Sequence, residues 1–353
     1  MHASLILLPF SWLFGLVVFL RNKAFDWGLL SVRRAGVPVI SVGNLTAGGT
    51  GKTPLVEYIV NYLLSSGKRV AVVSRGYGRR SAGVVVVSDG KSVLADARIG
   101  GDEPVQIARK FPSACVVVGE KRIQAARAAI EQCSAEVVVL DDGFQHRYLH
   151  RDLDIVVVNA RNDVTQEPML PAGLRRECLS GLRRADVIAM SKVGSISDAL
   201  EKGARLRRWY QGPLPAYRYK QAGIVSLRDQ KPVAIKEIAG LPALAFSGTG
   251  DNGGFVQDLR NMQFMVKETI GFHDHHEYSP ADVRTILEVA KTSGAKFAIT
   301  TEKDATRLLA SDALHAFRRE NLPVYYLCVG LEMLQGEEIL RERIDRVCGG
   351  GAD

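Results

Sequence analysis

The stretch from Ser41 to Val60, SVGNLTAGGTGKTPLVEYIV, most restricts the fold that this chain can adopt. It places Gly51, Lys52 and Thr53 between an apolar run, residues 37–42, and a helix-like segment, residues 54–64. In such a loop the backbone N–H groups and the helix N-terminus hold phosphate, the lysine reaches the β- and γ-phosphates, and the threonine ligates Mg²⁺. The stretch therefore predicts a P-loop NTPase-like α/β fold that binds a nucleoside triphosphate.

The loop departs from the usual pattern at one position. Thr46 stands five residues before Gly51, where a glycine is usual. Because glycine adopts positive φ without steric cost, we expect Gly43, Gly48 and Gly49 to supply the unusual backbone angles instead.

Further apolar, β-branched runs follow the loop, with helix-like segments such as 106–110 and 121–132 between them. The runs are residues 69–74, 114–118, 136–140, 153–159 and 186–190. Near-continuous valine and isoleucine strands that alternate with helices are typical of a parallel sheet with helices on both faces. Loops at the carboxyl ends of such strands carry the chemistry.

The length of 353 residues predicts two domains. The proline- and glycine-containing segment 206–231 is interpreted as the boundary or linker, and a second, smaller α/β unit follows it. The predicted parts are an N-terminal apolar helix (1–24), a P-loop kinase core (25–222), a second α/β domain that closes the cleft (223–330), and a C-terminal helix that packs back on the core (331–353).

The N-terminus is strongly apolar. Residues 3–20 carry no charge, and Arg21 and Lys23 follow. This length is at the lower limit for spanning a bilayer, and a buried core helix is the alternative. Trp12 and the basic residues favour a membrane-associating helix, either interfacial or a single anchor. The residues after Arg21 are expected to face the cytoplasm, where nucleotide is available.

The net charge and the cysteine content limit the kinds of partner and compartment that fit this chain. The net charge of +8 favours anionic partners such as an acidic membrane surface or a phosphorylated substrate. The basic residues lie in short, dispersed clusters, so no nucleic-acid module is indicated. The five cysteines form no CxxC pair, which predicts a reducing compartment without a zinc site or a disulfide framework.

Two carboxylates follow an apolar strand in the segment EVVVLDDGFQHRYL. A DDG turn alone is common, but strand-end carboxylates that face a phosphate loop form the second half of an NTPase metal site. Asp141 and Asp142 are therefore predicted Mg²⁺ ligands. Gln145 and His146 are close enough in sequence to contact the phosphates or the nucleotide.

Two further polar segments are candidates for acceptor chemistry. Asp102 and Glu103 lie between a glycine pair and a proline, either as helix N-terminal acids or as a general base for a hydroxyl. The segment FHDHHEYSPAD has no complete transition-metal ligand set. Its histidines either lie on a loop surface, tune a catalytic carboxylate or bind a phosphate.

Arginine side chains in SRGYGRR, residues 74–80, suit phosphate, although a simple turn is equally compatible with that segment. Guanine-specific P-loop proteins usually carry an Asn/Thr-Lys-x-Asp motif. The candidate here, residues 191–194, reads SKVG and lacks the aspartate. The sequence therefore favours ATP over GTP.

Together these segments resemble the tetraacyldisaccharide 4'-kinase family, the lipid A 4'-kinases of Gram-negative bacteria. The resemblance covers nearly the whole chain. Its motifs are the apolar N-terminus, GNLTAGGTGKTP, SRGYGR, GDEP, DDGFQH, LPAG with RE, DHHEYS and TEKD. It implies ATP-dependent phosphorylation, with Mg²⁺, of the 4'-hydroxyl of a tetraacylated disaccharide 1-phosphate. That lipid lies in the cytoplasmic leaflet of the inner membrane.

The resemblance also implies residue roles. Asp102 is expected to act as base, supported by His275 or His276, and Lys52 to act on the transferred phosphate. The expected ATP-binding residues are Thr46, Ala47, Gly48, Gly49, Thr50, Gly51, Lys52, Thr53, Gln145 and His146, and the expected metal ligands are Thr53, Asp141 and Asp142. The residues expected in the substrate cleft are Asn44, Arg75, Tyr77, Glu103, Arg176 and Glu177.

A P-loop GTPase or metallochaperone-type NTPase is the alternative from another class, and it requires the guanine motif that is missing here. A binding-only scaffold does not need Asp102 together with the strand-end carboxylates. No obligate protein partner is evident from the sequence.

Overall fold

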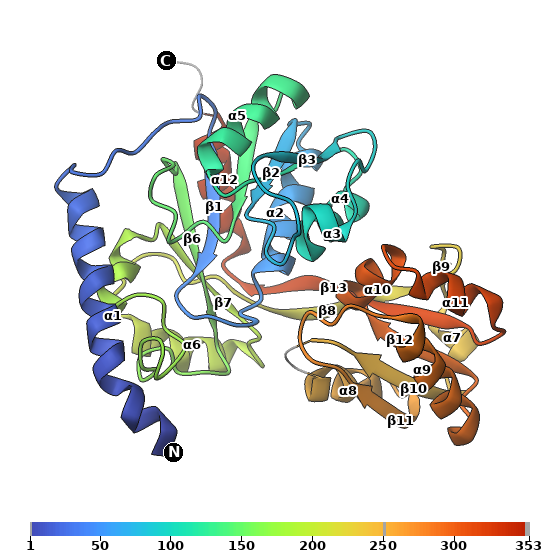
Figure 1. The fold of residues 1–353 in the computed structure, drawn as a ribbon. Helices are drawn as coiled ribbons and strands as arrows, with labels where there is room; N and C mark the ends of the chain where they lie inside the picture. Colours follow the sequence, from blue (N-terminus) through green and yellow to red (C-terminus); the bar gives the residue numbers. More distant parts are fainter. Residues whose placement is uncertain (1, 250–251, 350–353) are drawn as a thin grey trace.

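The computed structural model describes residues 2–249 and 252–349. Its strands form one thirteen-stranded sheet in the order β11-β10-β12-β13-β8-β7-β6-β1-β5-β2-β4-β3, with β9 paired to β8. The chain folds as an N-terminal helix, a large core unit and a smaller second unit (Figure 1). This arrangement confirms the predicted fold class.

The core unit is built on the parallel strands of one half of the sheet, where β3 is an antiparallel edge strand. β1 lies between β5 and β6, and β2 and β4 extend the sheet on the side of β5. The strands are β1 (Val39–Asn44), β2 (Val70–Ser74), β3 (Val85–Asp89), β4 (Cys115–Val118), β5 (Val137–Asp141), β6 (Leu153–Asn159) and β7 (Val187–Ser191). Because β1, β2, β4 and β5 are almost wholly buried on both faces, their sequences are continuous apolar runs.

Helices cover both faces of this core sheet. One face packs against α2, α4 and α12 through residues such as Leu55, Val105 and Leu340, and the other packs against α5 through Ala125 and Ala129. The core helices are α2 (Lys52–Ser65), α3 (Ala97–Gly100), α4 (Asp102–Lys110), α5 (Arg122–Cys133), η1 (Leu179–Arg184), α6 (Ile196–Leu206) and α12 (Glu337–Gly349).

Two long antiparallel strands connect the two units. They are β8 (Ala216–Ser226) and β13 (Val324–Gln335). The segment interpreted as a linker, 206–231, thus contains an eleven-residue strand. Its middle residues are exposed, so it shows no apolar run. The predicted domain boundaries at 222/223 and 330/331 fall inside these two strands.

The second unit carries its own parallel strands and helices. They are β9 (Pro232–Val233), α7 (Ile235–Ile238), β10 (Pro242–Ser247), α8 (Asn252–Asn261), β11 (Met265–Gly271), α9 (Pro280–Ser293), β12 (Phe297–Thr301), α10 (Glu302–Leu309) and α11 (Ala313–Arg319). The chain then returns to the core, where α12 contacts α2 through a hydrogen bond from Tyr58 Oη to Glu337 Oε1 at 2.7 Å.

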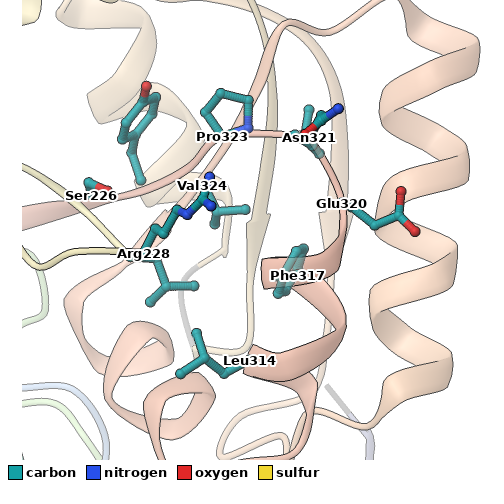
Figure 2. Close-up of a pocket in the computed structure, with 11 residues that line it drawn as sticks. Ser226, Arg228, Leu314, Phe317, Glu320, Asn321, Pro323 and Val324 are labelled. Carbon is teal, nitrogen blue, oxygen red and sulfur yellow. The ribbon is translucent and has the colours of Figure 1, made fainter.

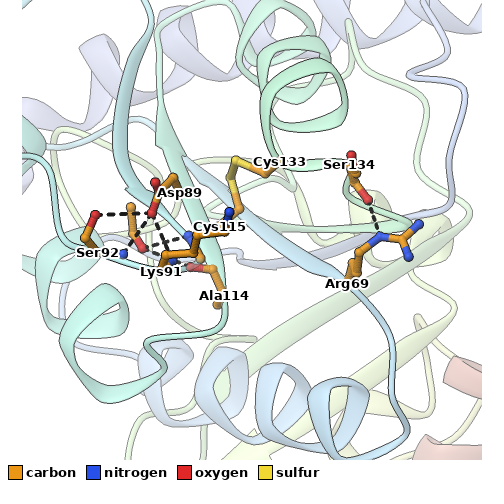
Figure 3. Close-up of a disulfide and its surroundings, with 10 residues drawn as sticks. Arg69, Asp89, Lys91, Ser92, Ala114, Cys115, Cys133 and Ser134 are labelled. Atoms are coloured by element: carbon orange, nitrogen blue, oxygen red, sulfur yellow. Dashed lines mark hydrogen bonds between the residues drawn. A yellow bond between two sulfur atoms is a disulfide. The ribbon is translucent and has the colours of Figure 1, made fainter.

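One expectation about the cysteines is wrong. Cys115 of β4 and Cys133 at the end of α5 form a disulfide (Figure 3). The two residues are 18 positions apart, but α5 packs back along β4 and brings its last residue beside the strand. Cysteine spacing alone does not show this proximity.

Candidate active site

The loop between β1 and α2 adopts the expected phosphate-loop geometry. Gly51 precedes the first residue of α2 in the left-handed region, at φ 91°, and a Cβ there would lie 2.9 Å from the Tyr219 hydroxyl. Asn44 Nδ2 donates to Thr46 O at 2.6 Å and to Thr50 Oγ1 at 2.8 Å. Asn44, which was predicted to lie in the substrate cleft, therefore stabilises the phosphate loop through its side chain.

The glycines of the loop differ in their roles. Gly48 has a positive φ of 94°, as expected, whereas Gly43 and Gly49 do not adopt positive φ. Gly43 is instead needed for close approach, because a Cβ at this position would lie 2.5 Å from Phe144 Cβ. The expectation that all three glycines supply unusual angles is correct for Gly48 alone.

Two residues that sequence reasoning missed donate hydrogen bonds to the backbone of the phosphate loop. Ser191 Oγ, at the end of β7, donates to Thr50 O at 2.5 Å. Tyr217 Oη, on β8, donates to Gly51 O at 2.8 Å. Both side chains are fully buried. Hydroxyls on these strands thus fix the backbone of the loop before any ligand binds.

The strand-end carboxylates lie beside the loop because of the sheet register. Asp141, the last residue of β5, is opposite Val42 of β1 and accepts a hydrogen bond from Ser74 Oγ at 3.3 Å. Burial, followed by the charge of Glu103, raises the pKa of Asp141 to about 7. Its buried Oδ1 has no protein hydrogen-bond partner.

The second carboxylate, Asp142, has two cationic partners. Lys52 Nζ lies 3.3 Å from Asp142 Oδ1, and Arg176 Nη1 donates to Asp142 Oδ2 at 3.0 Å. Burial raises the pKa of Asp142, but the charges of Lys52 and Arg176 outweigh burial and leave it below its ordinary value. The structure thus brings Lys52, Asp141 and Asp142 together beside the loop. It also places Arg176, which was expected in the substrate cleft, against Asp142.

Gln145 and His146 lie close to this group. Gln145 Nε2 donates to Asn44 O at 3.0 Å. Burial, followed by the charges of Arg122 and Arg151, lowers the pKa of His146 to about 4, so its imidazole is neutral at pH 7. Arg122, which the sequence analysis did not select, is buried. Burial lowers the pKa of its guanidinium, and the nearby charges of Asp142 and Asp141 oppose this effect only in part.

Asp102 lies where the two units meet. It is the first residue of α4, directly after Gly101, whose φ is 90°. Asp102 Oδ2 is 3.1 Å from His275 Nδ1 and accepts a hydrogen bond from Arg307 Nε at 2.6 Å. Burial raises the pKa of Asp102, but His275 and Arg307 together hold it below its ordinary value. This carboxylate is therefore ionised at neutral pH.

Helix α10 supplies two cations to Asp102 and its neighbours. Arg307 is held by the fully buried Asp304, at 3.0 Å, and by Gly248 O, at 2.8 Å. Lys303 Nζ lies 3.5 Å from Glu103 Oε1 and 3.4 Å from His275 Nε2. The motif TEKD was noticed in the sequence, but these two roles were not predicted. The sequence signal for these roles is the spacing of Lys303 and Arg307, which are four residues apart and therefore lie on one face of α10.

The two candidate histidines have different partners in the structure. His276 does not reach Asp102, because its Nε2 lies 3.2 Å from Asp282 Oδ2 and its Nδ1 lies 3.2 Å from His273 Nδ1. Asp282 also forms the capping box of α9 with Ser279, which holds His276 on the far side of the turn. Of the two, only His275 is placed to support Asp102.

The other predicted cleft residues lie in different surroundings. Tyr77 is 72% exposed, with its ring 5.4 Å from that of His275, and Arg75 is also exposed. Glu177 is buried, and its Oε2 accepts hydrogen bonds from Asn22 Nδ2 and Arg184 Nη2, both at 2.9 Å. This carboxylate connects the N-terminal helix to the core and does not line an open cleft.

The N-terminal helix α1 (His2–Asp26) lies along the core unit (Figure 1). Ser11 Oγ donates to Met169 O at 2.9 Å, and Arg21 Nη2 donates to Gln145 O at 2.5 Å. Its outer face exposes Phe10, Trp12, Leu13, Leu16 and Leu20. The segment Ile6–Asp26 is long and apolar enough to cross a membrane, and little of its most apolar stretch is buried.

A cavity of about 140 Å³ lies in the second unit, between α11 and β13 (Figure 2). Leu314, Phe317 and Val324 are among the residues that line it, together with Arg228. None of the residues lining it belongs to the predicted site.

Comparisons with known proteins identify relatives over almost the whole chain. The family model described as LpxK, tetraacyldisaccharide-1-P 4'-kinase, matches residues 3–349. The tetraacyldisaccharide 4'-kinase of Chlorobaculum parvum is 40% identical over 346 residues, covering 97% of this chain and 94% of the relative. That of Syntrophotalea carbinolica is 41% identical over 304 residues, covering 86% of this chain and 82% of the relative.

A solved structure agrees with these sequence relatives. The crystal structure of LpxK from Aquifex aeolicus in complex with ATP superposes with a TM-score of 0.79 at 32% sequence identity. The match covers 98% of this chain and 99% of that one.

Proposed function

Because the chain belongs to the tetraacyldisaccharide-1-P 4'-kinase family, we propose that it transfers the γ-phosphate of ATP to the 4'-hydroxyl of a tetraacylated disaccharide 1-phosphate in lipid A biosynthesis. The observation that carries this proposal is the joining of Asp102 to His275 across the two units. An ionised carboxylate held between the two units is suited to take the proton of an acceptor hydroxyl.

The nucleotide belongs on the loop 46–53. Its backbone N–H groups, the N-terminus of α2 and Lys52 would hold the triphosphate, with Gln145 and His146 at its edge. Arg176 reaches the same carboxylate as Lys52, so it is placed to stabilise charge on the transferred phosphoryl group.

Mg²⁺ fits the residues beside the loop. Asp141 offers a buried carboxylate oxygen without a protein partner, and Asp142 and the Thr53 hydroxyl would add further oxygen ligands. Mg²⁺ is usually held by one or two carboxylates together with substrate phosphates. When bound, it neutralises charge on the β- and γ-phosphates.

Asp102 acts as the base. As the 4'-oxygen forms its bond to the γ-phosphorus and the bond from that phosphorus to the β,γ-bridging oxygen breaks, the hydroxyl proton passes to Asp102 and ADP leaves. His275 and Arg307 orient the carboxylate and keep it ionised. Glu103 and Tyr77 border this acceptor position.

The lipid substrate explains the N-terminal helix. We place the exposed apolar face of α1 in the cytoplasmic leaflet of the inner membrane, with the helix lying in the interface. The contacts of Ser11 and Arg21 with the core keep the helix alongside the protein along most of its length. An apolar face beside basic residues suits an anionic membrane surface.

The test is the incubation of purified protein with γ-labelled ATP, Mg²⁺ and a panel of acceptors. We expect label on the tetraacylated disaccharide 1-phosphate and none on the same lipid with its 4'-position blocked. Release of labelled phosphate without a lipid product would contradict the proposal and favour a hydrolytic NTPase. Competition with unlabelled GTP tests the nucleotide preference.

A further inference from the structure

A buried cluster of charges lies on the opposite end of α4 from Asp102. Lys110, the last residue of α4, donates from Nζ to Glu57 Oε2 of α2 at 2.6 Å and to Val329 O of β13 at 3.1 Å. The same Nζ lies 3.5 Å from Glu302 Oε2, the first residue of α10. One ammonium group thus joins α4 to three other elements from both units.

Each helix in this cluster also carries a part of the active site. Helix α2 begins at Lys52, five residues before Glu57, and α4 begins at Asp102, eight residues before Lys110. A rise of about 1.5 Å per residue places Lys110 about 12 Å from Asp102 along α4. Helix α10 carries Glu302 at its start and Arg307, the partner of Asp102, further along. Both ends of α4 are therefore fixed to α10.

The cluster is largely shielded from water and contains two carboxylates but one ammonium group. Glu57 is 5% exposed, and its second oxygen accepts a hydrogen bond from Gln106 Nε2 at 3.0 Å. Glu57 and Glu302 share the single cation Lys110. Burial raises the pKa of Glu57 to about 7, the charge of Lys110 lowers it, and that of Glu302 raises it. Removal of Lys110 would leave the buried carboxylates without their cation, which is strongly destabilising.

We propose that Lys110 is a positioning residue for phosphoryl transfer. Its ammonium sets the placement of the Asp102 helix α4 relative to the Lys52 helix α2, while α10 packs against α4. The inference rests on the proposed kinase function. Transfer requires the acceptor oxygen and the γ-phosphorus in line, and a displacement of about 1 Å can cost up to about 10²-fold in rate. Lys110 touches neither substrate, so its effect is on kcat.

The first variant to test is Lys110→Met, which keeps the chain length and removes the charge. We expect kcat to fall by at least about 10-fold, while the dissociation constant for ATP stays within about 3-fold. Lys291→Met is the matched control, because Lys291 is exposed on α9, and it should leave both constants unchanged.

A second set of variants separates positioning from stability. The double variant Lys110→Met with Glu57→Gln carries no unpaired Glu57 carboxylate, so we expect its thermal stability to recover above that of Lys110→Met, while kcat stays low. Lys110→Arg keeps the charge with a different shape and should be stable but slow. Recovery of kcat together with stability in either variant would overturn the inference.

The failure of this inference is distinguishable from failure of the proposed function. If the wild-type protein phosphorylates no lipid acceptor, the proposed function fails, and amide hydrogen exchange in α4 with bound ATP still decides the role of Lys110. Faster exchange near Asp102 in the double variant supports positioning. Exchange identical to that of the wild type would overturn it.

Discussion

Arg307 of the second unit donates from Nε to Asp102 Oδ2 of the core at 2.6 Å. The arginine side chain is 5% exposed and the aspartate side chain 16% exposed, so this ion pair is shielded from solvent. A shielded pair of this kind couples two parts of the chain more strongly than a surface ion pair does. The base of the proposed reaction is therefore complete only when the two units are together.

Arg307→Gln should test this pair through the pH profile. Because the charge of Arg307 lowers the pKa of Asp102, its removal should raise that pKa and move the acid limb of kcat/KM to higher pH. Arg307→Lys should restore part of the shift. The measurement is kcat/KM between about pH 4 and 8, with Arg284→Gln, an exposed position on α9, as the control. An acid limb that does not move would separate Arg307 from the base.

Lys52→Ala should remove a cation from the phosphate loop. We expect kcat to fall by about 10²- to 10³-fold, because one preorganised electrostatic contact to the transferred group is lost. The measurement is single-turnover transfer from labelled ATP, with circular dichroism as the folding control. Near-normal turnover in the folded variant would contradict the assigned role of the loop.

The exposed face of α1 should govern membrane binding. Serine substitutions at Trp12, Leu13 and Leu16, which are 74%, 60% and 52% exposed, should lower the fraction that floats with anionic vesicles and raise KM for the lipid. ATP affinity should be unchanged. The control is the pair Ile196→Ser and Leu200→Ser on α6, which are 53% and 63% exposed. Equal loss of vesicle binding in both sets would place the attachment surface elsewhere.

The buried Glu57 gives a pH dependence of stability. Its pKa is raised from 4.5 to about 7, so the folded state holds a proton that the unfolded state has lost between these values. Its contribution to the free energy of unfolding is present below pH 4.5 and is lost as the pH rises through about 7, by about 3 kcal/mol at most. Urea unfolding at several pH values should show Glu57→Gln gaining stability relative to the wild type as the pH rises. Glu288→Gln, exposed on α9, should show no such trend.

The parts of the fold with strong local signals were predictable. Strand β6 matches the predicted residues, because it is a continuous apolar run, and helix α5 begins and ends within one residue of the predicted segment 121–132. Strand β8 was missed, since its exposed polar middle resembles a linker. Its partner β13 is only half-buried over most of its length, so it too lacks an apolar run.

The site was predictable where its residues follow strands and unpredictable where it depends on tertiary contacts. Asp141 and Asp142 follow β5, and Lys52 begins the helix after the loop that follows the neighbouring parallel strand β1, so their proximity follows from the sheet. The choice between His275 and His276 depends on Asp282, which holds the second histidine away. Arg307 and Glu177 lie in ordinary sequence contexts, and only the packed structure shows their partners.

The most direct test of the central claim is a double-mutant cycle on Asp102 and His275, read as kcat for lipid phosphorylation with direct measurement of ATP binding. Removal of a positioned base typically costs about 10²- to 10⁴-fold in rate. We predict that Asp102→Asn and His275→Ala each lower kcat strongly, leave ATP affinity within about 3-fold, and together are hardly worse than the poorer single variant. Losses that multiply fully, or a collapse of ATP affinity in Asp102→Asn, would contradict a single base unit assembled across the two units.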